Sequence, residues 1–237
     1  MTNDRSTFAP PTAGWWPLFG WVSFLFFVFT QVFAVVTSPA DRMMGHMQKM
    51  MYVHVPAAWV TFFAFGIVLL CSVGFLWTED ERQDLLAASA AEIGAVFCAL
   101  TLILGMFWGR PTWGVWWSWD ARLTSTLVLF LIFVGYLALR SFVEDPQRRG
   151  QWSAAVGILG AINVPIVWMS VKWWRTLHQL QSDPRSLEPV YWRGLMLNFL
   201  AFTLLTVFFI RRRYEAARYE RAAEHASQAA ALGGYNG

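Results

Sequence analysis

The amino-acid sequence predicts an all-α fold, a polytopic membrane protein built as a bundle of six transmembrane helices. Hydrophobic residues make up 57% of the 237 residues and charged residues only 14%, whereas a soluble domain usually carries about 25% charged residues. The chain also holds 15 tryptophans, and tryptophan concentrates at the boundary between membrane and water. Finally, six stretches of at least 17 residues are free, or nearly free, of ionisable side chains. That is close to the length a helix needs to cross a bilayer.

These six stretches are the expected transmembrane helices. They cover residues 14–40, 55–78, 85–108, 123–139, 151–171 and 194–210. The first is too long for a signal-peptide core, so we expect it to stay uncleaved. The fourth and sixth lie at the short end of the spanning range, and arginines that flank them can snorkel to the headgroups. Pro165 should kink the fifth helix, and Asn163 is expected to hydrogen-bond across helices.

Two features depart from this simple pattern. Glu92 interrupts the third stretch, and a carboxylate inside a membrane span is a candidate functional group, although it lies only about two turns from the end of that helix. The chain beyond residue 213 is rich in alanine and carries mixed charge, which indicates a surface helix. We therefore divide the chain into a six-helix domain, residues 1–213, and a cytoplasmic C-terminal tail, residues 214–237.

The arginines predict the orientation in the membrane. Six spans place both termini on the same side. Arg211, Arg212 and Arg213 follow the sixth span directly, and Arg148 and Arg149 follow the fourth. Basic residues concentrate on the cytoplasmic side, so we expect a multi-pass membrane protein with cytoplasmic N- and C-termini. The opposite face then has a net charge of +4, which favours an anionic ligand.

Between the third and fourth spans, this opposite face carries an unusual run of tryptophans, here called the Trp-rich segment (residues 108–122). Its pattern is W-G-x-x-x-W-G-x-W-W-x-W-D-x-R-L-T, with tryptophans at Trp108, Trp113, Trp116, Trp117 and Trp119. A membrane anchor normally needs one or two tryptophans per helix end, so five indicate a further role. Gly109 and Gly114 allow tight turns and a close approach of the backbone. A surface lined by tryptophans suits a large, flat, conjugated ligand, because stacking buries area at a low entropic cost.

This pattern resembles the tryptophan-rich WWD signature of heme-handling membrane proteins, in particular the CcmC family of the system I cytochrome c maturation pathway. Two further segments are similar to that family, Y-V-H-V-P-A-A at 52–58 and K-W-W-R-T-L-H-Q at 172–179. The resemblance covers nearly the whole chain and implies a place in the bacterial inner membrane. It implies that heme b is held on the outer, periplasmic face between two axial histidines, His54 and His178, beside the Trp-rich segment. It also implies delivery of the heme to a periplasmic heme chaperone and association with ABC transporter subunits of the maturation system.

The histidines support such a site independently. His54 precedes Pro56 at the start of the second span, His178 follows the fifth span, and the six-span topology places both on the face of the Trp-rich segment. An imidazole on each side of a porphyrin is a standard way to hold its iron. A single histidine at a membrane interface more often hydrogen-bonds to lipid or backbone. His46 shares this face without a matching motif and His225 lies in the tail, so neither is expected to be a ligand.

Further polar residues of the Trp-rich segment and its surroundings have predicted roles. Asp120 is expected to cap the N-terminus of the fourth helix by accepting a backbone N–H near Leu123. Four basic residues are candidate partners of the heme propionates, since guanidinium and ammonium groups pair with carboxylates. They are Arg110, Arg122, Lys172 and Arg175. Each taken alone is also typical of an ordinary contact with lipid headgroups.

The sequence excludes several other classes of protein. The basic residues are scattered between apolar runs, so we expect membrane lipid and no nucleic acid as a partner. The heme-attachment motif C-x-x-C-H is absent, so the chain is not itself a c-type cytochrome. Cys71 and Cys98 lie deep in apolar runs, where they are typical of small core residues. The sequence has no hydrolase or ATPase motif, so an enzymatic role would at most be a heme lyase-type activity on the chaperone.

We therefore predict a protein that binds heme and presents it to a chaperone, with two alternatives left open. The first is a permease subunit of an ABC-type heme exporter, which would need a polar path through the bundle. The second is an electron-transferring b-type cytochrome, in which the axial histidines usually lie inside helices.

Overall fold

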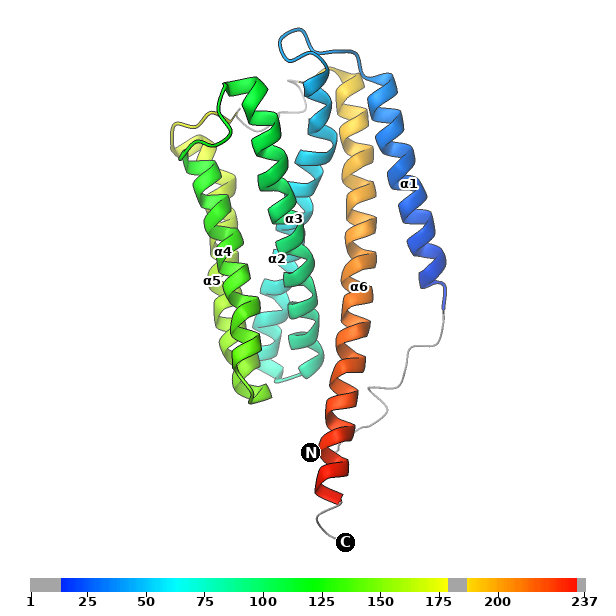
Figure 1. Cartoon of the computed structure of the whole chain (residues 1–237), viewed down its shortest axis with the longest axis vertical. Helices are drawn as coiled ribbons and strands as arrows, with labels where there is room; N and C mark the ends of the chain where they lie inside the picture. Colours follow the sequence, from blue (N-terminus) through cyan, green and yellow to red (C-terminus); the bar gives the residue numbers. More distant parts are fainter. Residues whose placement is uncertain (1–13, 179–186, 234–237) are drawn as a thin grey trace.

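The computed structural model describes residues 14–178 and 187–233, and these residues form a bundle of long helices (Figure 1). The elements are α1 (Trp16–Thr37), the short 3-10 helix η2 (His46–Met50), α2 (Met51–Thr78), α3 (Glu81–Trp113), α4 (Ala121–Phe142), α5 (Pro146–Trp173) and α6 (Pro189–Gly233). Six of these helices are long and apolar enough to cross a membrane. The predicted all-α fold with six spans is therefore confirmed, whereas the side of the membrane that carries the termini stays a prediction.

Aspartates begin three of the helices. Asp80, Asp120 and Asp145 precede α3, α4 and α5, and each side chain accepts a hydrogen bond from a backbone N–H of the first turn. These bonds satisfy donors that the start of a helix leaves without a partner. The contact between Asp120 and Leu123 N measures 2.9 Å and confirms the predicted N-cap.

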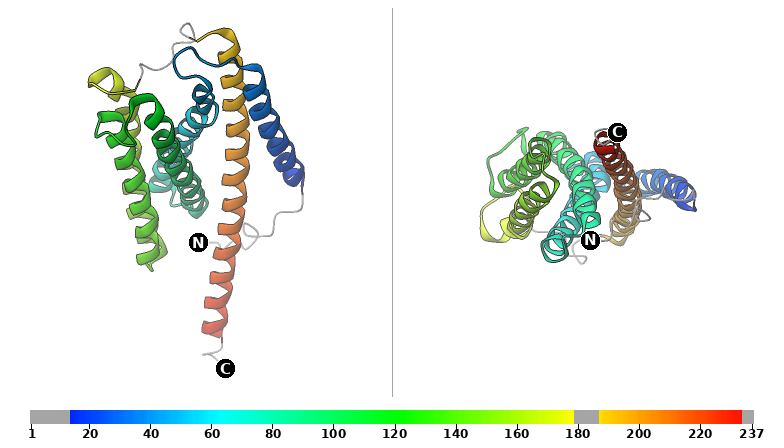
Figure 2. Two further views of the ribbon diagram at one scale, coloured as in Figure 1. Left: turned by 45° about the horizontal axis from the view of Figure 1, so that its top comes forward. Right: turned by 90° about the horizontal axis from the view of Figure 1, so that it is seen from below.

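The helices are arranged around α2 and α3 at the centre of the bundle (Figures 1 and 2). The antiparallel pair α4 and α5 packs on one side, while α6 packs on the other side and separates the bundle from α1. We call the end that carries the α3–α4 connection and the start of α2 the outer end. The opposite end, where α1 starts and α6 projects beyond the other helices, is the terminal end.

Aromatic stacking and small residues hold the centre together. The Phe65 ring of α2 stacks on the Phe133 ring of α4, with 3.5 Å between the ring centroids. Gly94 of α3 makes room for this pair, because a Cβ atom there would lie 2.6 Å from Phe65. Asn163 of α5 donates a 2.9 Å hydrogen bond to the Ser125 carbonyl of α4, as expected of a polar side chain inside a membrane bundle.

Several helix ends differ from the expected ones. α3 continues to Trp113 and ends at Gly114, whose φ of +80° suits glycine. The irregular part of the Trp-rich segment is therefore only residues 114–120. α2 begins at Met51 after a 3-10 turn, four residues before the expected start of the second span, so Pro56 lies inside the helix. α6 runs without a break through residue 213, and the division of the chain at that residue stays a prediction.

Candidate functional site

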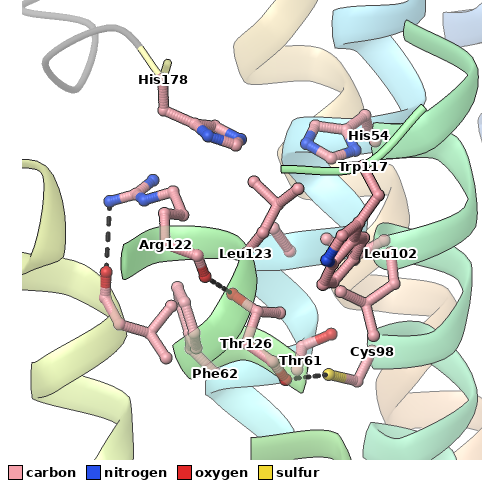
Figure 3. A pocket seen from close by; sticks show the side chains of 14 residues that line it. His54, Thr61, Phe62, Cys98, Leu102, Trp117, Arg122, Leu123, Thr126 and His178 are labelled. Atoms are coloured by element: carbon pink, nitrogen blue, oxygen red, sulfur yellow. Dashed lines mark hydrogen bonds between the residues drawn. The ribbon is translucent and has the colours of Figure 1, made fainter. Parts of the chain in front are cut away.

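A cavity of about 90 Å³ lies at the outer end, between α2, α3, α4, α5 and the segment that follows α5. Four of the predicted site residues line it: His54, Trp117, Arg122 and His178. Figure 3 shows the two imidazole rings at the top of this cavity, with Arg122 and Trp117 below them on opposite sides. The structure thus brings together residues that lie as far as 124 positions apart in the sequence.

His54 is fixed by helix α2, as the fourth residue from its start. Its Nδ1 atom is buried and has no hydrogen-bond partner among the described residues. The edge of the ring meets Trp108 of α3, with 5.6 Å between ring centroids and 74° between the planes. A Cβ atom at Gly105 of α3 would lie 3.2 Å from Cε1 of His54. Because any larger residue would press on the ring, glycine at this position sets how closely α3 approaches the imidazole.

His178 is held differently, by a carboxylate on another element. Asp120 uses one oxygen to cap α4 and the other to accept hydrogen bonds from Thr176 Oγ1 at 2.9 Å and Leu177 N at 3.1 Å. These contacts tie the segment after α5 to the start of α4. The same carboxylate lies 3.8 Å from His178 Nδ1, which is too long for a hydrogen bond. This nitrogen is also buried without a hydrogen-bond partner among the described residues.

Electrostatics keeps the His178 imidazole neutral and the Asp120 carboxylate charged. Burial and the nearby Arg122 guanidinium lower the pKa of His178 to about 4, although Asp120 opposes the shift. Burial alone would raise the pKa of Asp120, but the hydrogen bonds from Leu123, Leu177 and Thr176 outweigh it and lower that pKa. At neutral pH the imidazole therefore retains a lone pair that can bind a metal.

The five tryptophans of the Trp-rich segment fall into two groups. Trp108 contacts His54, Trp113 meets the His178 ring edge-on with 4.8 Å between centroids, and Trp117 lines the cavity. The indole Nε1 atoms of Trp108 and Trp117 are buried without a hydrogen-bond partner among the described residues. The side chains of the other two, Trp116 and Trp119, are 50% and 76% exposed. The segment thus has an inner group beside the histidines and an outer group at the surface.

The four basic candidates do not gather at one place. Arg122 lines the cavity, and its guanidinium donates to the carbonyls of Val167 at 3.3 Å and Trp168 at 3.1 Å on α5. Arg110 donates a 2.6 Å hydrogen bond to the Gly114 carbonyl, which closes the end of α3. Lys172 and Arg175 are exposed and are not among the residues that line the cavity.

The sequence reasoning missed the α3 wall of the cavity. Its residues Cys98, Thr101, Leu102 and Gly105 recur at intervals of three and four, the spacing that places side chains on one face of a helix. The periodic placement of Cys98, Thr101 and Gly105 on one face of the span was the available signal. His46, which was not expected to be a ligand, lies in η2 and is not among the lining residues.

Comparison with known proteins relates the chain to one family. The model of the family described as "Heme exporter protein C" matches residues 2–229. "Heme exporter protein C" of Bradyrhizobium diazoefficiens is 44% identical over 174 residues, 72% of this chain and 66% of that protein. A "Putative cytochrome c biosynthesis ccmC-like mitochondrial protein" of Marchantia polymorpha is 40% identical over 75% of this chain and 77% of its own length.

A third relative, "Heme exporter protein C" of Escherichia coli strain K12, is 37% identical over 71% of this chain and 72% of its own length. The match to the family model includes the regions of the three motifs that suggested the resemblance, because it extends over nearly the whole chain. The chain therefore belongs to the heme exporter protein C (CcmC) family.

Proposed function

We propose that this protein holds heme at the outer end of the bundle and delivers it to a heme chaperone on the periplasmic side. Membership of the heme exporter protein C family supports a role in heme handling for cytochrome c maturation and a place in the membrane. The finer proposal concerns the site, the ligands of the iron and the direction of delivery. One observation carries it, namely that His54 and His178 line the same cavity from separate elements.

The donor atoms of this cavity fit a metalloporphyrin. Two buried imidazole Nδ1 atoms have no hydrogen-bond partner among the described residues, and leaving a buried polar atom unpaired costs free energy unless a ligand satisfies it. His178 is neutral at physiological pH, and a neutral imidazole is a good ligand for heme iron. We therefore assign His54 and His178 as the two axial ligands of a heme b held without covalent attachment.

The cavity as it stands is too small to enclose a porphyrin. Its volume of about 90 Å³ is below the roughly 300–1,000 Å³ of sites that enclose ligands of drug size. A porphyrin therefore needs the two histidine-bearing elements to separate. His54 belongs to a long packed helix, whereas His178 follows the end of α5 and is tied down through Thr176 and Leu177. We infer that the His178 segment moves when heme enters or leaves.

The neighbouring side chains divide the remaining tasks. The inner tryptophans Trp108, Trp113 and Trp117 supply aromatic surface against the macrocycle. Arg122 is placed to meet a propionate, because it is the only one of the four basic candidates that lines the cavity among the described residues. The exposed Trp116 and Trp119 are positioned for contact with the chaperone. Arg110, Lys172 and Arg175 keep a secondary role at the rim of the site.

The core does not favour the passage of heme through this bundle. The stacked rings of Phe65 and Phe133 occupy its centre between the two ends. Glu92, the acid of the third span, is engaged by Arg213 at 2.6 Å near the terminal end. We therefore propose presentation at one face, with the ABC-type subunits of the maturation system as separate partner chains.

A combined spectroscopic and transfer experiment tests the proposal. The full chain, purified with heme, should give the spectrum of six-coordinate, low-spin iron and should lose heme to an added soluble periplasmic heme chaperone. Retention of heme in the presence of the chaperone, or a high-spin spectrum in the unaltered protein, would contradict the proposal. Cysteine labelling checks the orientation: a cysteine at Ser118 should react from outside intact cells, and one at Gln147 should not. Ser182, a further candidate for outside labelling, lies beyond the described residues.

A further inference from the structure

A second cavity, of about 460 Å³, lies at the terminal end of the bundle. Residues of α3, α4, α5 and α6 line it, and they include both apolar and charged side chains. Leu85 begins one apolar stretch and Leu137 lies near the end of another, which Arg140 follows directly, and Arg213 comes shortly after the end of the sixth stretch. The cavity therefore lies at the depth where a lipid chain meets its headgroup.

Three of the four arginines that line this cavity are paired with carboxylates. Arg140 binds Asp84 through two hydrogen bonds, at 2.5 and 2.7 Å. Arg213 lies 2.6 Å from Glu92 and 3.3 Å from Glu220. Arg221 lies 2.6 Å from Glu81 and 2.7 Å from Glu224. Each of these five carboxylates is therefore paired with an arginine other than Arg149, and none of the five pairs with Arg149.

Arg149, near the start of α5, is the fourth arginine of the cavity. Within the described parts of the chain, its guanidinium forms neither a side-chain hydrogen bond nor an ion pair, and its Nε atom is buried. A partly buried cation without a counter-ion is costly, because desolvation is not repaid by any partner. The like charges of Arg221 and Arg140 lie nearby, and the carboxylates of Glu224 and Asp84, which act in the opposite direction, are already engaged by those two arginines. The cavity thus has a cation whose partner is missing from the folded chain.

We propose that this cavity binds a phosphate anion through Arg149, carried by an anionic phospholipid headgroup or free in solution. A guanidinium presents its N–H groups in a planar fork that matches the oxygens of a phosphate. The apolar side chains of Leu85, Ala88 and Leu137 on the same walls suit the first carbons of a lipid, which favours the phospholipid as the source. Bound there, the anion would join α5 to α3, α4 and the projecting part of α6.

The test measures the thermal stabilisation of the full chain by phosphatidylglycerol, added to phosphatidylcholine nanodiscs. Each variant is compared with its own midpoint in phosphatidylcholine alone, so a general loss of stability does not affect the result. Arg148→Gln is the matched control, because Arg148 is the exposed neighbour of Arg149. We expect phosphatidylglycerol to raise the midpoint of thermal unfolding of the unaltered protein and of this control. Arg149→Gln should bind phosphatidylglycerol about tenfold more weakly, and Arg149→Lys should fall between the two.

Native mass spectrometry of the same samples should show phosphatidylglycerol retained by the unaltered protein and depleted in Arg149→Gln. Inorganic phosphate distinguishes the sources of the anion. If it displaces the lipid at millimolar concentration and stabilises the protein without phosphatidylglycerol, the ligand is free phosphate. If it does neither, the ligand is the headgroup. Equal stabilisation and equal lipid retention in Arg149→Gln and the unaltered protein, with no effect of phosphate, would overturn the proposal. The heme spectrum is not part of the readout, so this outcome is independent of the outer site.

Discussion

The two ends of the bundle treat buried polar groups in opposite ways. At the outer end, the imidazole Nδ1 atoms of His54 and His178 and the indole N–H groups of Trp108 and Trp117 are buried without hydrogen-bond partners in the described chain. At the terminal end, buried charges such as Asp84 and Arg140 are paired at short distances. Unpaired donors cost stability, and paired charges limit that cost. The difference indicates that the outer end keeps atoms ready for a ligand, while the paired charges of the terminal end, Arg149 excepted, hold helices together.

Asp120 and Asp84 show this contrast in single residues. Asp84 is buried and spends both oxygens on one arginine, so it joins α3 to α4. Asp120 accepts only neutral donors, two from the segment before His178 and one from α4. Hydrogen bonds from neutral donors to a carboxylate are weaker than an ion pair with two hydrogen bonds. The joint at the outer end is therefore the easier of the two to open, as a site that must release its ligand requires.

The largest expected effect comes from removing the proposed ligands. Replacing both His54 and His178 by alanine should abolish low-spin heme, and each single replacement should leave five-coordinate or weakly held iron. Added imidazole should partly refill the vacated position in the single variants. His46→Ala and His225→Ala are controls and should change little. Optical and electron paramagnetic resonance spectra measure the result. Low-spin heme at normal occupancy in the double variant would contradict the assignment of His54 and His178 as axial ligands.

The next largest effect is expected at the terminal end, in stability and not in heme binding. Asp84→Ala leaves Arg140 buried without its partner and should cost about 3–5 kcal/mol of folding free energy. Thermal unfolding in detergent measures the loss, and the heme spectrum of the folded fraction should be unchanged. Replacing both partners by apolar residues, Asp84→Leu with Arg140→Met, should restore most of the stability. A heme spectrum altered by Asp84→Ala would show that the two ends are not independent.

Within the outer end, the inner and the outer tryptophans are expected to differ in their effects. Trp113→Ala and Trp117→Ala should each weaken heme retention by about 1–3 kcal/mol, because each removes aromatic surface beside the histidines. Trp116→Ala and Trp119→Ala should have smaller effects on retention, since these side chains are exposed, and larger ones on transfer to the chaperone. The low-spin spectrum should persist in all four variants. If a single tryptophan change abolished the spectrum as fully as a histidine change, the division into two groups would be wrong.

The smallest effect concerns pH. The pKa of His178 is about 4 in the folded chain and about 6.5 in an unfolded one, so protons bind first to the unfolded state as the pH falls. The free energy of unfolding of the heme-free protein should therefore be constant above about pH 6.5 and decrease toward pH 4. His178→Gln should remove this part of the pH dependence. Chemical denaturation of the heme-free protein between about pH 4 and pH 8 measures the loss.

Local patterns in the sequence were sufficient for much of the molecule. Long apolar stretches predicted the six spans, and the residues confirmed in local roles, such as the cap at Asp120, act within one helical turn. The placement of His54 and His178 at one end followed from the even number of spans that separate these two residues in the sequence. Helix ends were less predictable: Pro111 did not stop α3 before Trp113, because a proline near the C-terminus of a helix removes only one hydrogen bond.

The sequence by itself thus determined the fold class, the family and the end of the bundle that carries the candidate site, since these depend on hydrophobic length and on motifs contiguous in the chain. Only the tertiary structure decided which tryptophans face the histidines, that Asp120 also holds the His178 segment, and that Arg149 lacks the partner its neighbours have. Such contacts join side chains tens of residues apart. They depend on the rotation and depth of each helix against the others, which packing of the whole bundle fixes and no local pattern records.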